Sequence, residues 1–341
     1  MSSEESNRAP SRPPAPELSV VIPVYGCAQC LIELHKRLNA SIETVCESWE
    51  IIFVDDRAPD GSWQILQSLA AADSRVVAIR FSKNFGQQMA ISAGIQRSRG
   101  QMVAVMDCDL QDPPEIIPQL VAEFRKGTDM VLARRVAHLQ SPLRRWSNRF
   151  YFRFLQFLSG TRIDGDYCSL SILSRKVADA YSRFTEVDRH YLFILFWLGF
   201  SFRTVDYQRQ RRASGESSYS YADLIRLALS GIFFQTTRLL AWVAQLGLLV
   251  AVIGILYGLQ LMFGTLVLGH APPQGWTSLI VIVLFTSGAI IASVGIVGLY
   301  VARIFEQMKG RPLYIIDVEL RDGQQVPASV APRESGYSVA K

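Results

Sequence analysis

The chain has 341 residues, enough for one large domain with an accessory element or for two domains. Its net charge of +5 is too modest to indicate a nucleic-acid partner, although basic residues near a lipid surface would still matter. Only 19% of the residues are charged and 49% are hydrophobic, a composition that is unusual for a wholly soluble enzyme. The composition therefore directs attention to membrane-spanning segments.

The first part of the chain alternates apolar strands with helical patterns. Residues 1–17 are polar and rich in proline, which predicts a disordered tail without a signal peptide. Five strands are expected after it, each but the last followed by a helix: Leu18–Gly26, Glu50–Asp56, Val76–Phe81, Val103–Met106 and Met130–Ala133. Such alternation predicts a doubly wound, Rossmann-like α/β domain with a mainly parallel sheet, extending over residues 18–220.

The strand at Val103–Met106 ends in two carboxylates, Asp107 and Asp109. Residues separated by one position point to the same side of an extended chain, and parallel sheets bind ligands at the carboxyl ends of their strands. Two carboxylates there suit a divalent cation, Mg²⁺ or Mn²⁺. The alternative is an Asp-rich turn with Pro113-Pro114 beginning the next helix.

A second strand also ends in carboxylates, Asp55 and Asp56, so two strands deliver acidic residues to the same sheet edge. Neither a GxGxxG sequence after the first strand nor a GxxxxGK[ST] sequence is present. A nucleotide site built on carboxylates needs a metal ion to offset the phosphate charge, which indicates a nucleoside-diphosphate donor. Individually, either aspartate also suits a turn that caps a helix.

No Asp, Glu, Lys or Arg occurs between Arg238 and Arg303. This interval holds two apolar stretches, 239–263 and 277–302, each long enough to cross a bilayer and separated by glycines and prolines. One such stretch alone could be a buried core helix, but two in tandem predict a transmembrane hairpin. Lysine or arginine residues precede the first stretch and follow the second, and the loop between the stretches has none. The positive-inside rule therefore places the α/β domain and the tail 303–341 in the cytoplasm.

Two segments before the hairpin are expected to lie at the membrane interface. Residues 142–160 alternate aromatic and arginine side chains at helical spacing, and 221–238 form a second apolar helix that leads into the first span. A surface helix with solvated arginines is the alternative for 142–160. Between these segments lies a flexible basic loop, in which Arg209, Arg211, Arg212 and Ser217 could hold a lipid phosphate.

The five cysteines show no disulfide framework, which suits a reducing cytoplasm. Cys27 and Cys30 form one CxxC sequence, which lacks a second pair for zinc and does not favour a redox or metal function. The four histidines are scattered and form no ligand or triad spacing.

Several motifs together resemble family 2 glycosyltransferases of the GT-A fold. They are Val21-Ile22-Pro23-Val24-Tyr25, Val54-Asp55-Asp56, Asn84-Phe85-Gly86 and Asp107-Cys108-Asp109-Leu110-Gln111-Asp112-Pro113-Pro114. The similarity covers about residues 18–318 and is closest to polyprenyl-phosphate glycosyltransferases, partly through Gly298–Glu306 and Arg311–Tyr314. Each motif alone is weak, but the combination is specific.

The resemblance implies roles for individual residues. It assigns the nucleotide to Pro23, Val24, Tyr25, Asp55, Asp56, Asn84 and Asp107. It assigns the metal to Asp107, Asp109 and Gln111, and catalysis to Asp109 and Asp166, although Asp166 would equally suit a turn. It assigns the acceptor phosphate to Arg134, Arg145 and Ser147 in addition to the basic loop, where Ser218 replaces the usual lysine.

The reaction that the resemblance implies is inverting transfer of a sugar from a UDP- or dTDP-sugar to a polyprenyl phosphate, undecaprenyl phosphate, at the bacterial inner membrane. The product would be a lipid-linked sugar for a cell-envelope glycan or for lipid modification, and relatives suggest a homotetramer. Ser169 stands where the glucosyl branch carries Asp, which argues for a less ordinary donor sugar. The acceptor phosphate, with a second pKa near 6, is already largely dianionic at neutral pH and hardly needs a general base.

Two other functions remain open at this point. A processive polysaccharide synthase would need a Gln-X-X-Arg-Trp motif, but Gln140 lies too far before Arg145-Trp146, and only two spans are expected. A non-catalytic, membrane-tethered nucleotide-binding protein would not need the intact Asp107 and Asp109.

Overall fold

The computed structural model describes residues 15–136, 167–187, 189–208, scattered positions between 245 and 263, and 275–326. The chain divides into two compact units, which are described separately. One comprises Met1–Asn148, Ile163–Ser217 and Arg311–Lys341, and the other comprises Arg149–Arg162 and Ser218–Gly310.

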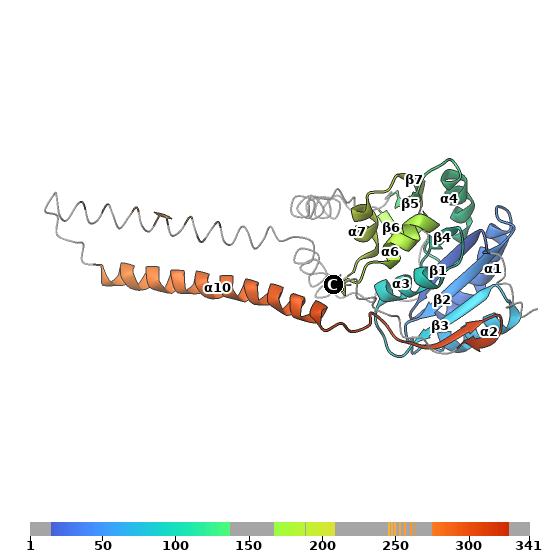
Figure 1. Cartoon of the computed structure of the whole chain (residues 1–341), viewed down its shortest axis with the longest axis horizontal. Coiled ribbons are helices and arrows are strands. Elements are labelled where there is room, and N and C mark those ends of the chain that lie inside the picture. Colours follow the sequence, from blue (N-terminus) through green and yellow to red (C-terminus); the bar gives the residue numbers. More distant parts are fainter. Residues whose placement is uncertain are drawn as a thin grey trace, which may run out of the picture. The chain divides into compact units, whose positions relative to one another are not determined.

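The first unit is built on a nine-stranded sheet of order β7-β5-β6-β4-β1-β2-β3-β8-β9 (Figure 1). The strands are β1 (Leu18–Val24), β2 (Trp49–Asp55), β3 (Val76–Phe81), β4 (Met102–Val105), β5 (Met130–Arg135), β6 (Tyr167–Ser174), β7 (Phe202–Tyr207), β8 (Ile316–Arg321) and β9 (Gln324–Val326). β1 pairs in parallel with β2 and β4, and β2 with β3. Only β6 and β8 run against the common direction, so the prediction of a mainly parallel sheet is confirmed.

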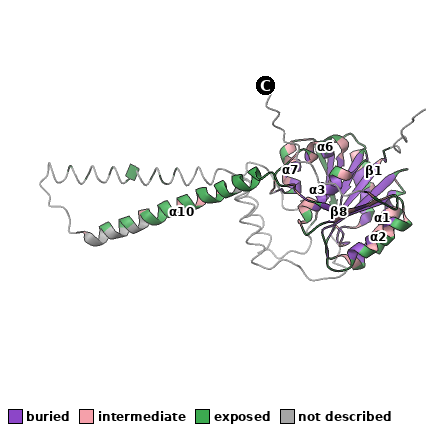
Figure 2. Ribbon diagram, turned by 60° about the horizontal axis from the view of Figure 1, so that its bottom comes forward, coloured by how far each residue is buried: buried purple, intermediate pink, exposed green. Residues whose placement is uncertain are grey.

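Helices cover both faces of this sheet, because the central strands are apolar on both sides. Val20 and Ile22 of β1 face a core shared with α1 (Leu31–Ile42), α2 (Ser62–Ala72) and α4 (Ile117–Phe124). Val21, between them, faces the opposite core, formed with α3 (Gln87–Arg97), α6 (Arg175–Ser182) and α7 (Tyr191–Leu198). Figure 2 shows the buried strands between these helices. Short 3₁₀ turns, η1 (Ala28–Cys30) and η2 (Pro114–Ile116), precede α1 and α4.

α3 approaches β1 closely enough to require a glycine. A Cβ atom added at Gly94 would lie 2.2 Å from a methyl carbon of Val21, so any larger residue would push the helix away from the strand. This contact matters for the site because α3 begins at Gln87, directly beside the carboxyl ends of the strands.

Two parts of the sheet differ from the expected strand sequence. β6 inserts antiparallel between β4 and β5, so the fifth predicted strand is not the neighbour of the fourth. At the other side, β8 and β9 come from the segment predicted to be a C-terminal tail. Tyr314 stacks on Phe81 of β3 with ring centroids 5.2 Å apart, and residues 316–326 are therefore part of the α/β domain.

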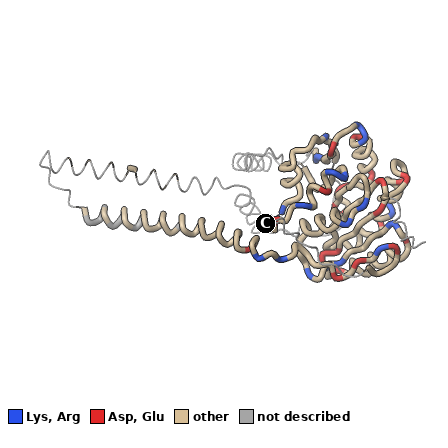
Figure 3. The backbone as a smooth tube through the Cα atoms, viewed as in Figure 1, with Lys and Arg blue, Asp and Glu red and all other residues tan. Residues whose placement is uncertain are grey.

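In the second unit, α10 (Trp276–Met308) extends over 33 residues. Its segment Thr286–Met308 is long and apolar enough to cross a membrane, and the apolar part of this segment is not buried against other parts of the protein. Figure 3 shows charge only toward its C-terminal end. α10 contains the second predicted span, whereas the first span, 239–263, and the interface segments 142–160 and 221–238 lie mostly or wholly outside the described residues.

Candidate active site

The candidate site lies where β1, β2 and β4 end, at the same edge of the sheet. Val24 pairs with Asp55, and Val21 with Val105, so the loops that follow these strands are neighbours. Tyr25, immediately after β1, is 55% exposed and is available to a ligand. Asn84 is also exposed, in the loop between β3 and α3.

Asp107 is held at this edge by two side chains from other elements. Gln87 Nε2, at the start of α3, donates to its Oδ1 at 2.8 Å, and Ser169 Oγ, on β6, donates to the same oxygen at 2.9 Å. Burial and the neighbouring carboxylates of Asp112 and Asp109 raise the pKa of Asp107 to about 6. The corner therefore concentrates negative charge that a cation would offset.

The chain turns sharply after Asp109. Its Oδ1 accepts a hydrogen bond from the backbone N–H of Gln111 at 3.1 Å, and Leu110 between them has φ +58°. A non-glycine residue in this left-handed region costs of order 1 kcal/mol and is often found at functional sites. Arg57, directly after Asp56, is another non-glycine residue with a positive φ. Both carboxylate loops therefore contain a residue in the left-handed region.

Behind the corner, Asp112 is only 1% exposed. Its Oδ1 accepts a hydrogen bond from the Tyr207 hydroxyl, and Arg135 Nη2 lies 3.8 Å from its Oδ2. Arg135 Nε also donates to the Tyr207 hydroxyl at 3.2 Å. Strands β5 and β7 therefore hold the loop after Asp109 from behind, through one buried carboxylate.

Asp55 and Asp56 are buried, with 0% and 2% exposure. Asp55 Oδ1 accepts from the Ala58 N–H at 3.0 Å, as expected for a residue that closes a turn. The Asp56 carboxylate accepts from the N–H groups of Phe85 and Gly86 at 2.6 and 2.8 Å. Burial raises the pKa of both groups, and their contacts hold loops rather than leave free oxygens at the surface. Their predicted nucleotide contacts stay predictions.

The predicted acceptor-phosphate residues are only partly described. Arg134 makes a two-point ion pair with Asp206, Nε to Oδ1 at 2.7 Å and Nη2 to Oδ2 at 2.9 Å. The next residue on the strand, Arg135, is the one that turns toward the acidic corner. The remaining predicted residues lie outside the described residues: Arg145, Ser147, Asp166, Arg209, Arg211, Arg212 and Ser217.

A disulfide joins Cys27, in the loop after β1, to Cys108, between the two aspartates, with their Cα atoms 6.2 Å apart. The expectation that the chain lacks a disulfide is therefore wrong. The two cysteines are 81 positions apart in sequence and meet only because β1 and β4 are neighbouring strands. The CxxC partner, Cys30, is buried and has a free thiol.

The chemistry of the corner fits a divalent cation. Asp107 and Asp109 supply hard carboxylate oxygens, and Gln111, although 8% exposed, adds an amide in the same loop. Within the described ranges, no three His, Cys, Asp or Glu side chains converge on one point. Two carboxylates are the usual protein share of a Mg²⁺ or Mn²⁺ site in which substrate phosphates and water supply the other ligands.

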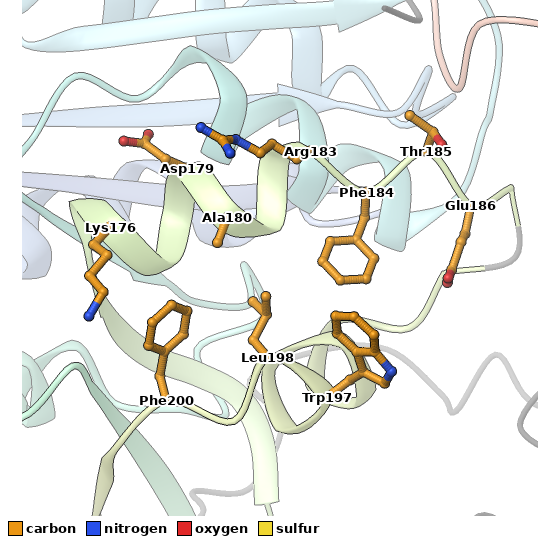
Figure 4. A pocket seen from close by; sticks show the side chains of 10 residues that line it. All are labelled: Lys176, Asp179, Ala180, Arg183, Phe184, Thr185, Glu186, Trp197, Leu198 and Phe200. Atoms are coloured by element: carbon orange, nitrogen blue, oxygen red, sulfur yellow. The ribbon is translucent and has the colours of Figure 1, made fainter. Parts of the chain in front are cut away.

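A pocket of about 840 Å³ lies elsewhere on the α/β domain, between α6 and α7 (Figure 4). Phe184 and Trp197, which both line it, make an edge-to-face contact with ring centroids 5.2 Å apart. Lys176 and Arg183 of the lining come from α6 or its C-terminal end. None of its lining residues belongs to the carboxylate corner, so we do not include it in the site.

Sequence patterns alone missed three side chains that support the corner, Gln87, Arg135 and Tyr207, and for Ser169, which the resemblance had singled out, they missed the contact with Asp107. Gln87 directly follows the Asn84-Phe85-Gly86 motif, which was the available signal for it. The other three come from β5, β6 and β7, and nothing local connects them with Asp107 or Asp112.

The mainly parallel α/β domain with paired aspartates at its carboxyl edge defines the chain as a glycosyltransferase of the GT-A fold. Residues 19–182 match the model described as Glycosyl transferase family 2. The SfII prophage-derived bactoprenol glucosyl transferase of Shigella flexneri is 34% identical over 302 residues, 88% of this chain and 97% of that protein. An uncharacterized glycosyltransferase of Bacillus subtilis is 32% identical, over 88% of this chain and 93% of that protein.

The chain therefore belongs to glycosyl transferase family 2. A prophage bactoprenol glucosyl transferase homolog of Escherichia coli, 32% identical over 88% of this chain and 98% of that protein, extends the same similarity. The resemblance inferred from the motifs, including its polyprenyl-phosphate branch, is thus confirmed.

Proposed function

We propose that this glycosyltransferase moves a sugar from a nucleoside-diphosphate sugar, of the UDP or dTDP series, to a polyprenyl phosphate such as undecaprenyl phosphate. Relatives named bactoprenol glucosyl transferase support the acceptor class. The product would be a lipid-linked sugar that serves a cell-envelope glycan or a lipid modification.

The observation that carries this proposal is the Asp107 and Asp109 corner. Asp107 is fixed from both sides by Gln87 and Ser169, so one of its oxygens is engaged and its orientation is set before any ligand arrives. A Mg²⁺ or Mn²⁺ ion bound there would stabilise the charge that develops on the leaving diphosphate. Tyr25, exposed at the same edge, supports a nucleotide in the adjoining loop.

The residues have a limited chemical task, because the nucleophile is already charged. A phosphate monoester has a second pKa near 6 and is largely dianionic at neutral pH. It can attack the anomeric carbon directly, which inverts the configuration, and the protein supplies alignment. Arginines of the loop around Arg209–Arg212 and at Arg134 and Arg145 would hold the acceptor phosphate, with Asp166 near the donor sugar.

The charge-free stretch between Arg238 and Arg303 and the apolar helix α10 support a membrane arrangement. We propose that α10 and the segment 239–263 form a hairpin in the inner membrane, with the α/β domain on the cytoplasmic side. The segments 142–160 and 221–238 would lie in the interface, which brings the lipid phosphate within reach of the domain. A homotetramer is the assembly suggested by the resemblance.

The test uses the full chain in membranes or nanodiscs with undecaprenyl phosphate, a panel of UDP- and dTDP-sugars, and Mg²⁺ or Mn²⁺. We expect one donor to give a lipid-linked monosaccharide, detected by thin-layer chromatography and mass spectrometry, and Asp109→Asn to lower its rate of formation about a thousandfold. Elongated polysaccharide would indicate a processive synthase instead. Absence of any lipid product with every donor, from protein that is folded by circular dichroism, would contradict the proposal.

A further inference from the structure

The Cys27–Cys108 disulfide connects the two loops of the proposed donor site. Cys27 follows the exposed Tyr25 by two positions, and Cys108 lies between Asp107 and Asp109. The Cα separation of 6.2 Å lies within the ordinary range for a disulfide. The bond therefore restrains both sides of the site at once.

The fold does not depend on this bond to bring the loops together. β1 and β4 are paired from Leu18↔Met102 to Val21↔Val105. In addition, the Ala28 N–H donates to Oδ2 of Asp60, a residue of the loop after β2, at 2.9 Å. Opening the disulfide would leave these contacts in place. What it would release is the position of Cys108, and with it the backbone that sets the spacing between Asp107 and Asp109.

The two sulfur atoms differ in access. Cys27 is partly exposed, whereas Cys108 is only 6% exposed. Because thiol–disulfide exchange depends on access to the attacked sulfur, an incoming thiolate would attack Cys27 and displace Cys108 as the leaving thiolate. In a cytoplasmic domain, disulfides are usually transient and either catalytic or redox-sensing.

We propose that Cys27–Cys108 is a redox-modification site whose reaction partner is a dithiol reductant, and that its opening weakens metal and nucleotide binding at Asp107 and Asp109. This inference rests on the proposed function, because it names a control of the same donor site. The intact bond holds the loops in the arrangement that binds the metal and nucleotide.

The exchange balances without any further component. One thiolate of the dithiol forms a mixed disulfide with Cys27, and Cys108 leaves as a thiolate that takes up a proton. The second thiolate of the reductant then closes its own disulfide and releases Cys27. Two electrons pass from the dithiol to the protein, which gains two thiols while the reductant becomes a cyclic or intramolecular disulfide.

The test compares oxidised and reduced full-length protein in nanodiscs. Reduction uses a resin-bound dithiol that is filtered off under argon, so that no soluble thiol binds the metal. Differential alkylation with peptide mass spectrometry reports the state of Cys27 and Cys108. Electron paramagnetic resonance of free Mn²⁺, titrated in the presence of UDP, reports the metal affinity apart from any sugar transfer.

We expect Cys27 and Cys108 to resist alkylation before reduction and to react after it. The Kd for Mn²⁺ should rise about tenfold on reduction, the size of effect seen when groups that orient metal ligands are lost. Cys108→Ser, which cannot form the disulfide, should show the weaker Mn²⁺ affinity under both oxidising and reducing conditions. Cys46→Ser is the matched control, because Cys46 is buried outside the corner and should leave the redox response unchanged.

Two results would overturn the inference: free thiols at Cys27 and Cys108 in the oxidised protein, or equal Mn²⁺ affinity in both redox states. Failure of the proposed function looks different. In that case neither redox form would bind Mn²⁺ with UDP or make a lipid-linked sugar, and the inference would fall with it.

Discussion

The two carboxylate pairs follow the same pattern in sequence, a buried strand that ends in aspartates, yet the structure uses them differently. Asp56 accepts two backbone N–H groups from the Phe85-Gly86 turn and is 2% exposed. Asp107 is half-buried, accepts hydrogen bonds from the side chains of Gln87 and Ser169, and has a pKa that burial and the neighbouring carboxylates raise.

This difference separates a carboxylate whose contacts are to the backbone of a neighbouring loop from one whose contacts are to side chains. The backbone N–H groups of Phe85 and Gly86 satisfy both carboxylate oxygens of Asp56 within the fold. At the corner, burial and the carboxylates of Asp112 and Asp109 raise the pKa of Asp107, so several acidic groups are close together there. A motif of strand and aspartates is therefore not enough to identify a metal site, and the donors around each carboxylate decide its role.

The strongest test of the comparison is Asp109→Asn. Removing one of the two proposed metal-ligand charges should lower sugar transfer about a thousandfold, equivalent to about 4 kcal/mol of barrier, with little change in folding. The measurement is kcat/KM for the lipid acceptor reaction together with circular dichroism. A variant that unfolds, or one that keeps full activity, would contradict the assignment of this residue to ligand binding.

The converse test is Asp56→Ala. It leaves the N–H groups of Phe85 and Gly86 without their acceptor, and the free energy of unfolding should fall by about 2–4 kcal/mol. Thermal or urea unfolding in detergent measures this change. Asp179→Ala, an exposed carboxylate paired with Arg175 on α6, is the control and should change stability by less than about 1 kcal/mol. Equal losses of unfolding free energy in Asp56→Ala and Asp179→Ala would contradict the view that Asp56 stabilises the Phe85-Gly86 loop.

A smaller effect is expected from Gln87→Leu, which deletes one donor to Asp107. Because second-sphere hydrogen bonds orient metal ligands, the Kd for Mn²⁺ should rise about tenfold while the strand pairing is unchanged. Gln88→Leu is the matched control, since that side chain accepts the Tyr191 N–H at 2.7 Å and does not contact Asp107. A larger loss of Mn²⁺ affinity in the control would show that α3, not the hydrogen bond, is responsible.

The smallest effect concerns a carboxylate outside both loops. Burial would raise the pKa of Asp73, but hydrogen bonds from Arg75 and His35 hold it at about 2. The folded pKa is below the unfolded value, so the stabilisation is complete above about pH 4 and is lost as pH falls toward 2. Asp73→Asn should lower stability by about 1 kcal/mol at pH 7 and flatten this acid dependence, leaving Mn²⁺ affinity unchanged. A steep acid dependence that persists in Asp73→Asn would argue against this carboxylate as its source.

The sequence predicted well those parts of the molecule in which local pattern and position coincide. β3 was expected at Val76–Phe81 and forms there, and the carboxyl ends of β1, β2 and β4 meet as the parallel alternation requires. β6 and β8 were not anticipated, because their partners β4, β5 and β3 are distant in sequence. The same holds for Ser169 and for the Cys27–Cys108 pair, whose contacts depend on which strands become neighbours.

The return of the chain to the sheet after α10 has a consequence for biosynthesis. β3 acquires its antiparallel partner only from Ile316–Arg321, and Arg321 Nη1 reaches Glu50 of β2 at 3.0 Å. During synthesis, residues 276–308 leave the ribosome before these contacts can form. The α/β domain therefore cannot complete its own edge until the apolar helix has been made, so the last pairing of the sheet has to wait for the synthesis of that helix.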